Sequence, residues 1–189
     1  MNAPLKTSRL TLVPPNAEWL DGYEHALAQG WSPNTTHDIS RDQLAMLRRD
    51  RANFFHEAYH SPNFRLPDGT FVPRLPARDF LIVDGEFCGR IGLRFQTGTV
   101  ELPPYVSGHI GYTIVPWKQG RGYATEALRR ILPVAREVGL ARVMITCDDD
   151  NIGSIKVIRA NGGIPAGDKD HETRPDRRKL LFWVPTPEA

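Results

Sequence analysis

The residues from Gln119 to Ala124, QGRGYA, combine a glycine-rich turn with the start of an amphipathic run. Gly120 and Gly122, on either side of Arg121, leave little side-chain bulk over the backbone. A helix that begins directly after them leaves its first amide N–H groups without intrahelical acceptors. Together these features predict a site that binds an anion such as a phosphate group.

Two common phosphate-binding turns do not fit these residues. A P-loop needs Lys and then Ser or Thr directly after its last glycine, whereas Tyr123 and Ala124 stand there. A dinucleotide fingerprint needs three spaced glycines and an acidic residue about 20 positions later. A nucleotide-binding protein is therefore a weak alternative for this turn.

The turn resembles the signature of the GNAT superfamily of acetyl-CoA-dependent N-acetyltransferases. That signature is Arg or Gln, two residues, Gly, one residue, then Gly or Ala, and Gln119, Gly122 and Ala124 match it. In the family, the signature follows a strand that pairs with the pantetheine arm of CoA, and it opens a long helix. Residues 112–115, YTIV, and the run that begins at Tyr123 stand in those two places.

A second family pattern lies further along the chain. The family often has Asn, two residues, then Ser or Ala at the start of the next helix, which a glycine pair ends. Asn151, Ser154 and Gly162-Gly163 match this pattern. The likeness covers residues 79–184 and looks like a branch of predicted bacterial acetyltransferases without assigned substrates, whereas residues 1–78 show no specific match.

The resemblance implies an α/β fold with a mixed, largely antiparallel sheet flanked by helices, in which two splayed parallel strands form the CoA cleft. It implies acetyl-CoA as the acetyl donor. CoA carries a pyrophosphate and an extended pantetheine chain, which suit backbone N–H groups at a helix N-terminus and at an open strand edge. The expected CoA-binding residues are Tyr112, Ile114, Gln119, Gly120, Arg121, Gly122, Tyr123, Ala124, Asn151 and Ser154.

The implied reaction is direct attack of a primary amine on the thioester in a ternary complex, without a metal. An alkyl ammonium has a pKa of about 10.4, so the amine must lose a proton and the thioester oxyanion needs a donor. A backbone N–H of the strand ending at Ile114 can be that donor. His109 and Glu101 are the candidate bases, although a core histidine and a solvated loop carboxylate explain these two residues equally well.

The chain departs from one habit of the family. Many members place a Tyr in the helix after the Asn, where its hydroxyl can protonate the departing thiolate, but Val157-Ile158 stands there. Tyr112 or Tyr123 can substitute, or the thiolate can leave without help. The missing tyrosine also keeps open a non-catalytic alternative, an acyl-CoA sensor or interaction module of the same fold.

Helices and strands must position these residues, and hydrophobic periodicity predicts most of those helices and strands. A helix is predicted over 17–29 with Asn16 as its cap, and a second over 40–58 with Ser40 as its cap. Four prolines predict a loop over 60–77, with a turn at Pro67-Asp68-Gly69. Gly108 and Gly111 suggest a bulge. Strands are predicted at 8–13, 79–84, 87–95, 107–115, 142–147 and 179–184, the last after a charged loop, and helices at 123–138, kinked at Pro133 and ended by Gly139, and at 152–160.

Length and charge limit the number of domains and the classes of partner. The 189 residues predict one domain over 1–189, with 1–78 shaping the acceptor side and 79–184 forming the CoA-binding core. Lys and Arg number 24 and Asp and Glu 22, which gives no overall field for nucleic acid or an anionic membrane.

The remaining expectations concern the compartment and the partner. Cys88 and Cys147 lie in apolar runs without metal or disulfide spacing, and the N-terminal residues lack a long apolar stretch, so we expect a cytoplasmic protein without a metal site. The expected acceptor is a small-molecule or peptide amine. Protein N-termini, amino acids, polyamines and aminoglycosides stay open, as does a homodimer.

Overall fold

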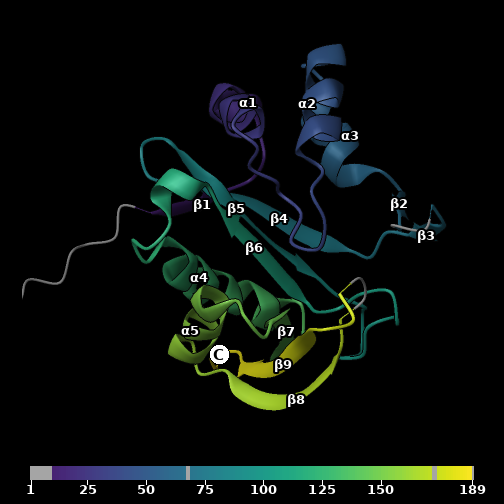
Figure 1. Ribbon diagram of the computed structural model, residues 1–189, viewed down its shortest axis with the longest axis vertical. Coiled ribbons are helices and arrows are strands. Elements are labelled where there is room, and N and C mark those ends of the chain that lie inside the picture. Colours follow the sequence, from purple (N-terminus) through teal and green to yellow (C-terminus); the bar gives the residue numbers. More distant parts are fainter. Residues whose placement is uncertain (1–9, 67–68, 172–173, 189) are drawn as a thin grey trace, which may run out of the picture.

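Two antiparallel sheets form the centre of the molecule in a computed structural model, which describes residues 10–66, 69–171 and 174–188 (Figure 1). The first sheet has the order β1-β4-β5-β6, with β1 (Thr11–Val13), β4 (Ala77–Val83), β5 (Phe87–Arg94) and β6 (Ile110–Ile114). The second has the order β7-β9-β8, with β7 (Arg142–Asp148), β9 (Arg178–Pro185) and β8 (Ile164–Asp170). This mixed α/β architecture, with helices on its flanks, confirms the predicted fold class.

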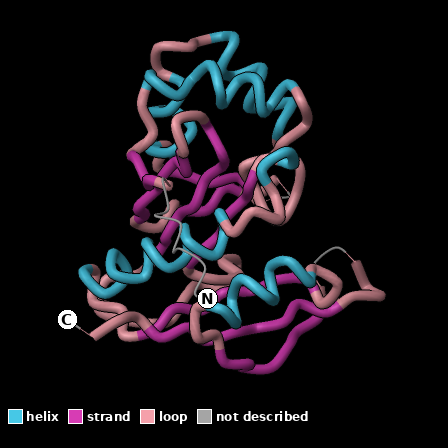
Figure 2. Tube along the Cα trace, turned by 90° about the vertical axis from the view of Figure 1, so that its left-hand side faces the viewer, coloured by secondary structure: helices cyan, strands magenta, loops and turns pink. Residues whose placement is uncertain are grey.

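The helices form two groups, and each group buries its own core. One group packs on the outer face of the first sheet and the other lies between the sheets (Figures 1 and 2). The outer group comprises the 3₁₀ turn η1 (Ala17–Trp19), α1 (Leu20–Ala28), α2 (Ser40–Arg49) and α3 (Phe54–His60). The inner group comprises α4 (Tyr123–Glu137), which follows the turn η2 (Pro116–Lys118), and α5 (Ile152–Ala160). None of the described helices is both long and apolar enough to cross a membrane.

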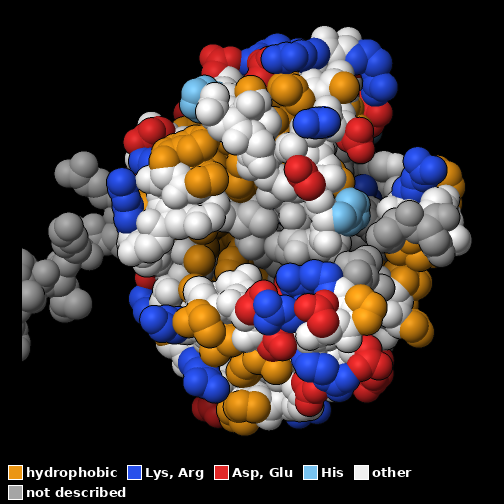
Figure 3. Space-filling model, viewed as in Figure 1, with side chains coloured by type: hydrophobic (Ala, Val, Ile, Leu, Met, Phe, Trp, Pro, Cys, Tyr) orange, Lys and Arg blue, Asp and Glu red, His pale blue; other side chains and the backbone are white. Residues whose placement is uncertain are grey.

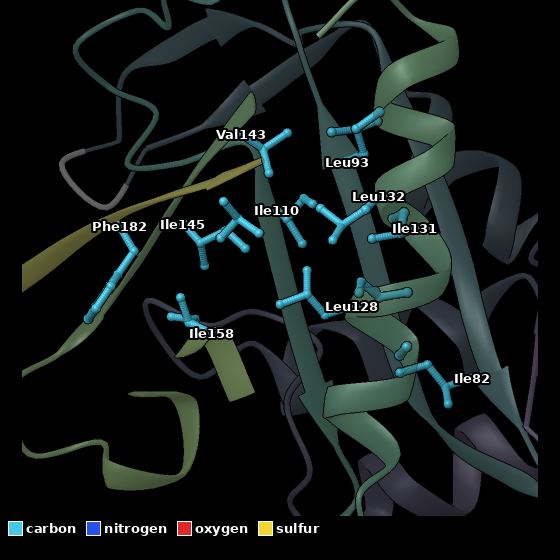
Figure 4. Packing of buried hydrophobic residues seen from close by; sticks show 14 of the residues in the cluster. Ile82, Leu93, Ile110, Leu128, Ile131, Leu132, Val143, Ile145, Ile158 and Phe182 are labelled. Atoms are coloured by element: carbon cyan, nitrogen blue, oxygen red, sulfur yellow. The ribbon is translucent and has the colours of Figure 1, made fainter. Parts of the chain in front are cut away.

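The larger core lies around α4. Its apolar face, with Leu128 and Ile131, packs against Ile110 of β6 and Ile145 of β7 (Figure 4). Because α4 contacts both sheets, it fixes β6 and β7 relative to each other. The second core joins α1, α2 and α3 to the opposite face of β4 and β5 through aromatic contacts centred on Tyr23.

Two predictions for the N-terminal half need correction, and a third is confirmed. The predicted helix over 40–58 is two helices, because Asp50 accepts hydrogen bonds from the Asn53 N–H (3.2 Å) and Nδ2 (2.8 Å), which competes with helical pairing. Asp38 rather than Ser40 supplies the capping oxygen, since the Ser40 N–H donates to Asp38 Oδ1 at 2.8 Å. The predicted cap at Asn16 is confirmed, because its side chain accepts from the Glu18 N–H at 2.9 Å.

Two segments predicted as loops contain strands. The stretch over 60–77 holds a short hairpin of β2 (Asn63–Arg65) and β3 (Phe71–Pro73), and Pro67 and Asp68 of the predicted turn lie outside the described residues, as do residues 8 and 9 of the first predicted strand. The charged loop before β9 contains β8, whose carboxylates Asp168 and Asp170 pair with Arg178 of β9. Cross-strand ion pairs thus replace the apolar pattern that would have revealed this strand.

Candidate active site

A cavity of about 790 Å³ lies where β6 and β7 separate. The His109 N–H donates to the Met144 carbonyl at 2.7 Å just before β6 begins, and the described strands form no ladder beyond this contact. Residues 110–114 and 145–148 line the cavity, so the two strands leave their contact in the same direction and diverge. The face drawn in Figure 3 is hollowed between the half that carries α1–α3 and the half that carries β8 and β9.

The strands separate without the bulge that the sequence suggested. The β5–β6 register is continuous from Leu93–Ile110 to Gly89–Ile114, so the expected bulge at Gly111 is wrong. Gly108 instead allows the two strands to approach, because a Cβ on it would lie 3.0 Å from the Met144 carbonyl oxygen. Close approach of two backbones therefore explains this glycine.

One edge of β6 faces the cavity and has no partner strand among the described residues. On the other edge, the His109 carbonyl accepts from the Arg94 N–H and the Val115 N–H donates to the Cys88 carbonyl. Antiparallel ladders alternate, so the intervening even-numbered residues turn their N–H and C=O groups away from β5. Those of Tyr112 and Ile114, both predicted to bind CoA, therefore face the cavity.

The glycine turn has the shape of an anion cradle. Gly120 and Gly122 have φ values of +72° and +83°, and a Cβ built on either meets no other atom within 4 Å. The amides of residues 123–125 have no backbone or capping partner in the described chain, and they begin α4. Open space over free N–H groups at a helix N-terminus suits a pyrophosphate.

The side chains around this turn have separate tasks. Gln119 Nε2 donates to the Ile114 carbonyl at 3.1 Å, which ties the turn to the end of β6. The Tyr123 hydroxyl donates to Asp84 Oδ2 at 2.7 Å, while Ala124 lines the cavity beside it. Arg121 is exposed and does not line the cavity, so its predicted contact with phosphate stays a prediction.

Asn151 and Ser154 begin α5 on the opposite side of the cavity. Asn151 Oδ1 accepts from the Ser154 N–H at 2.9 Å, so this side chain caps the helix. Its amide nitrogen has no partner among the described residues. Both residues line the cavity, which leaves that nitrogen available to a ligand.

Replacing Asn151 separates these two tasks. Asn151→Ser keeps a capping oxygen but removes the amide donor, whereas Asn151→Ala removes both. We expect both variants to weaken acetyl-CoA binding by about tenfold, in line with loss of one hydrogen bond, and only the alanine variant to lose about 1 kcal/mol of stability. Calorimetric titration and urea unfolding measure the two quantities. Wild-type affinity in Asn151→Ser would leave Asn151 with a capping role alone.

Tyr112 carries a hydroxyl that forms no hydrogen bond of ordinary geometry with the described chain, although the Ser154 side chain lies near it. The side chain lines the cavity, and its oxygen is buried with no hydrogen bond among the described residues. Burial raises the pKa of Tyr112 to about 12, which the Ser154 hydroxyl on α5 partly opposes. A protonated phenol thus lies between β6 and α5, on the side of β6 that faces α4.

His109 has a structural contact that argues against a role as base. The side chain is fully buried, does not line the cavity, and its Nδ1 accepts from the Met144 N–H at 2.9 Å. Burial lowers the pKa of His109 to about 4. A neutral imidazole with so low a pKa is a poor acceptor for the proton of an ammonium group, and the ring instead helps hold β6 against β7.

His109 predicts a pH dependence of stability. The folded pKa of about 4 lies below the value of about 6.5 in an unfolded chain, so protonation favours unfolding. The contribution of up to about 3 kcal/mol is complete above pH 6.5 and is lost as the pH falls towards 4. His109→Asn keeps an acceptor for Met144 and cannot titrate, so its free energy of unfolding should fall less between pH 7 and 4.5. Equal pH slopes in urea unfolding would contradict this contact.

Two carboxylates, Glu101 and Asp148, lie close enough to the site to be considered as bases. Glu101 is exposed on the loop between β5 and β6 and does not line the cavity, so its role as base stays a prediction. Asp148 is the single carboxylate among the described lining residues. Although burial alone would raise it, the pKa of Asp148 is held below its usual value by Lys179, 2.5 Å away, and by Arg174.

The structure also brings residues of the unassigned N-terminal half to the site. Thr35 and the neighbouring loop residues line the cavity, and so does Arg94 of β5. The signal for Arg94 was present in the sequence as a cation between the apolar residues Leu93 and Phe95. No pattern marked the loop, because its place depends on the packing of α1 and α2.

The chain is similar to known acetyltransferases in sequence pattern and in fold. A family model described as an acetyltransferase (GNAT) domain matches residues 9–164. RimL, a ribosomal L7/L12 alpha-N-protein acetyltransferase solved with coenzyme A, has a TM-score of 0.63 and 17% identity over 96% of both chains. The microcin C7 self-immunity acetyltransferase MccE, solved with acetyl-CoA and AMP, has a TM-score of 0.59 and 13% identity over 93% of this chain and 92% of that chain.

A third similar structure is an acetyltransferase named for spermidine. A chimera of the spermidine N-acetyltransferase SpeG from Vibrio cholerae has a TM-score of 0.60 and 13% identity, over 95% of this chain and 96% of that chain. At these identities the likeness shows the fold. A search of curated proteins found no match.

Proposed function

Because the chain belongs to the GNAT acetyltransferase family, whose domain spans residues 9–164, we propose that it moves an acetyl group from acetyl-CoA to a primary amine by direct attack in a ternary complex. The observation that carries this proposal is the joining of three features around one cavity. These are the open edge of β6, the glycine turn at the start of α4, and Asn151 at the start of α5. The family match also includes residues 9–78, where sequence motifs alone showed no likeness.

The residues present fit the donor that the family uses, acetyl-CoA. The space over Gly120 and Gly122 would be filled by any Cβ, and the amides beneath it suit the pyrophosphate. The free edge of β6 suits the two amides of the pantetheine chain, as an added strand would. We propose that the N–H groups of Tyr112 and Ile114 donate hydrogen bonds to the pantetheine chain and to the thioester oxygen.

Tyr112 supports departure of the thiol. Its hydroxyl donates a hydrogen bond to the sulfur as negative charge develops there. A phenol of pKa about 12 is a weaker acid than a thiol of about 8.5, so hydrogen-bond donation costs less than full proton transfer. Over the whole reaction, a proton lost by the amine nitrogen replaces the acetyl group on sulfur.

Deprotonation of the amine is assigned to solvent in the cavity. Among the described lining residues, the carboxylate of Asp148 is bound by Lys179 and Arg174, and His109 lies outside the lining. The log of kcat/KM should therefore rise with pH towards the pKa of the amine itself. Glu101→Gln is the control, because loss of activity in that variant would make this carboxylate the base.

Direct attack is favoured over an acetylated enzyme. Cys147 lines the cavity, but burial raises the pKa of its thiol to about 11, and burial does the same to Cys88. A buried thiol with so high a pKa supplies almost no thiolate at neutral pH. A nucleophilic cysteine is therefore not needed in this scheme.

Release of free thiol from acetyl-CoA with a panel of amines tests the proposal. An acetyltransferase releases thiol only when an acceptor is present. The alternative, an acyl-CoA sensor, binds CoA and releases no thiol with any amine. A nucleotide-binding protein would gain thermal stability from ATP rather than from CoA.

A further inference from the structure

Arg94 is a guanidinium without a partner at the acceptor side of the cavity. The residue lines the cavity, and its side chain has no hydrogen bond or ion pair with any described residue. Its Nη2 lies 2.8 Å from the position that a Cβ on Gly111 would occupy. The guanidinium therefore lies directly over the middle of β6, where the glycine leaves room.

The surroundings of Arg94 hold more positive than negative charge. Arg74, Arg90 and Arg94 lie near one carboxylate, Asp79, and Arg90 already binds it at 2.5 Å. Arg90 is fixed further by the Pro33 carbonyl at 3.0 Å. Burial, followed by the charge of Arg90, lowers the pKa of Arg94 to about 10, so it is still charged at neutral pH. Two cations of this cluster are left without a counter-charge among the described residues.

A hydroxyl completes the anion site. Thr35 Oγ1 lies 3.7 Å from the same Cβ position on Gly111 and has no hydrogen bond within the described chain. Asn34 holds this loop in place, because its Oδ1 accepts from the Thr36 N–H at 2.7 Å. Arg94 and Thr35 thus place donors close to the same point.

This point lies on the opposite face of β6 from Tyr112. Neighbouring residues of a strand point to opposite faces, so Gly111 faces Arg94 and Thr35 while Tyr112 faces α4 and α5. The CoA-binding features described above belong to the second face. An anion at Arg94 would therefore belong to the other substrate.

We propose that Arg94, with Thr35, binds a carboxylate or phosphate group of the acceptor, so that the substrate is an amine carrying an anionic group close to its amino group. The inference rests on the proposed acetyl transfer and names its substrate class. A guanidinium suits both anions because it can donate two parallel hydrogen bonds. The same cluster repels polycations, which disfavours polyamine acceptors.

Steady-state thiol release with four amines tests the substrate class. β-Alanine and O-phosphoethanolamine carry the two anions, ethanolamine is the neutral control, and spermidine is the cationic one. We expect kcat/KM for at least one anionic amine to exceed that for ethanolamine by about 10- to 100-fold, as charge-assisted hydrogen bonds allow. The ratio between the two anionic amines distinguishes a carboxylate from a phosphate ligand. Preference for ethanolamine or spermidine would overturn the inference.

Variants of Arg94 test the residue itself. In Arg94→Met we expect KM for the anionic amine to rise about 10- to 100-fold while kcat, the ethanolamine rate and CoA affinity change little. Arg94→Lys should restore part of the loss, and Arg78→Ala, an exposed arginine on neighbouring β4, should change nothing. Equal KM values in wild type and Arg94→Met would overturn the assignment.

Binding without turnover separates this inference from the proposed function. If no amine releases thiol, acetyl transfer fails, and thermal unfolding with CoA plus β-alanine or O-phosphoethanolamine still reports on Arg94. A rise in melting temperature that Arg94→Met abolishes supports the anion site. No rise in wild type overturns it.

Discussion

Gly122→Val should weaken CoA binding by about 100-fold or more while the chain still folds. The valine side chain would fill the open space over the turn and block the amides at the start of α4 from a pyrophosphate. Loss of two hydrogen bonds to a charged group accounts for an effect of about this size. Calorimetric titration with CoA measures it.

A glycine just beyond the C-terminal end of α4 supplies the matched control. Gly139 follows the last turn of this helix with φ +90°, and a Cβ on it also meets nothing within 4 Å. It does not line the cavity. Valine at either position should lose about 1–2 kcal/mol of stability through the left-handed backbone. If Gly139→Val weakened CoA binding as much as Gly122→Val, the cradle would be wrong and strain in α4 would explain both results.

Tyr112→Phe should lower kcat by about 100-fold and leave CoA affinity close to that of the wild type. The substitution removes only the hydroxyl, which is buried at the cavity near Ser154 and forms no hydrogen bond of ordinary geometry in the described chain. General-acid and hydrogen-bond donors of this kind contribute factors of about 10²–10⁴. Pre-steady-state release of thiol isolates the step from product release.

Tyr123→Phe is the companion variant, because Tyr123 is the other tyrosine of the site. Its hydroxyl already donates to Asp84 and ties α4 to the β4–β5 turn. We therefore expect a loss of stability of about 1 kcal/mol and little change in kcat. Full activity in Tyr112→Phe would mean that the thiolate leaves without help, and a large loss in Tyr123→Phe would transfer the role to that residue.

The turn, helix and cap that we propose to bind CoA could be located from the sequence because these features are local. The glycines of residues 119–124, the long apolar face of α4 and the cap at Asn151 each depend on neighbours within a few positions along the chain. Backbone groups do most of the expected binding, and the alternation of β6 sets their direction. Such features follow from turn chemistry and periodicity.

The acceptor side could not be predicted in the same way. Arg94 and Thr35 are far apart in the sequence and come close only because α1–α3 pack on the outer face of the first sheet. His109 is the opposite case: its sequence position suggested catalysis, but its ring accepts a hydrogen bond from the Met144 N–H of β7. Whether a side chain on a strand faces the cavity or the core depends on which elements pack against that strand. Long-range packing decides this, and one sequence does not reveal it.

Mass analysis of all products after one incubation with acetyl-CoA and an amine tests the central claim most directly. The proposed direct transfer predicts that the amine gains one acetyl group for each thiol released, and that the protein, including Cys147, gains none. Tight CoA binding with no acetylated amine and no free thiol, across anionic, neutral and cationic amines, would contradict it and leave a sensor. An acetylated protein that forms without amine would contradict the ternary complex.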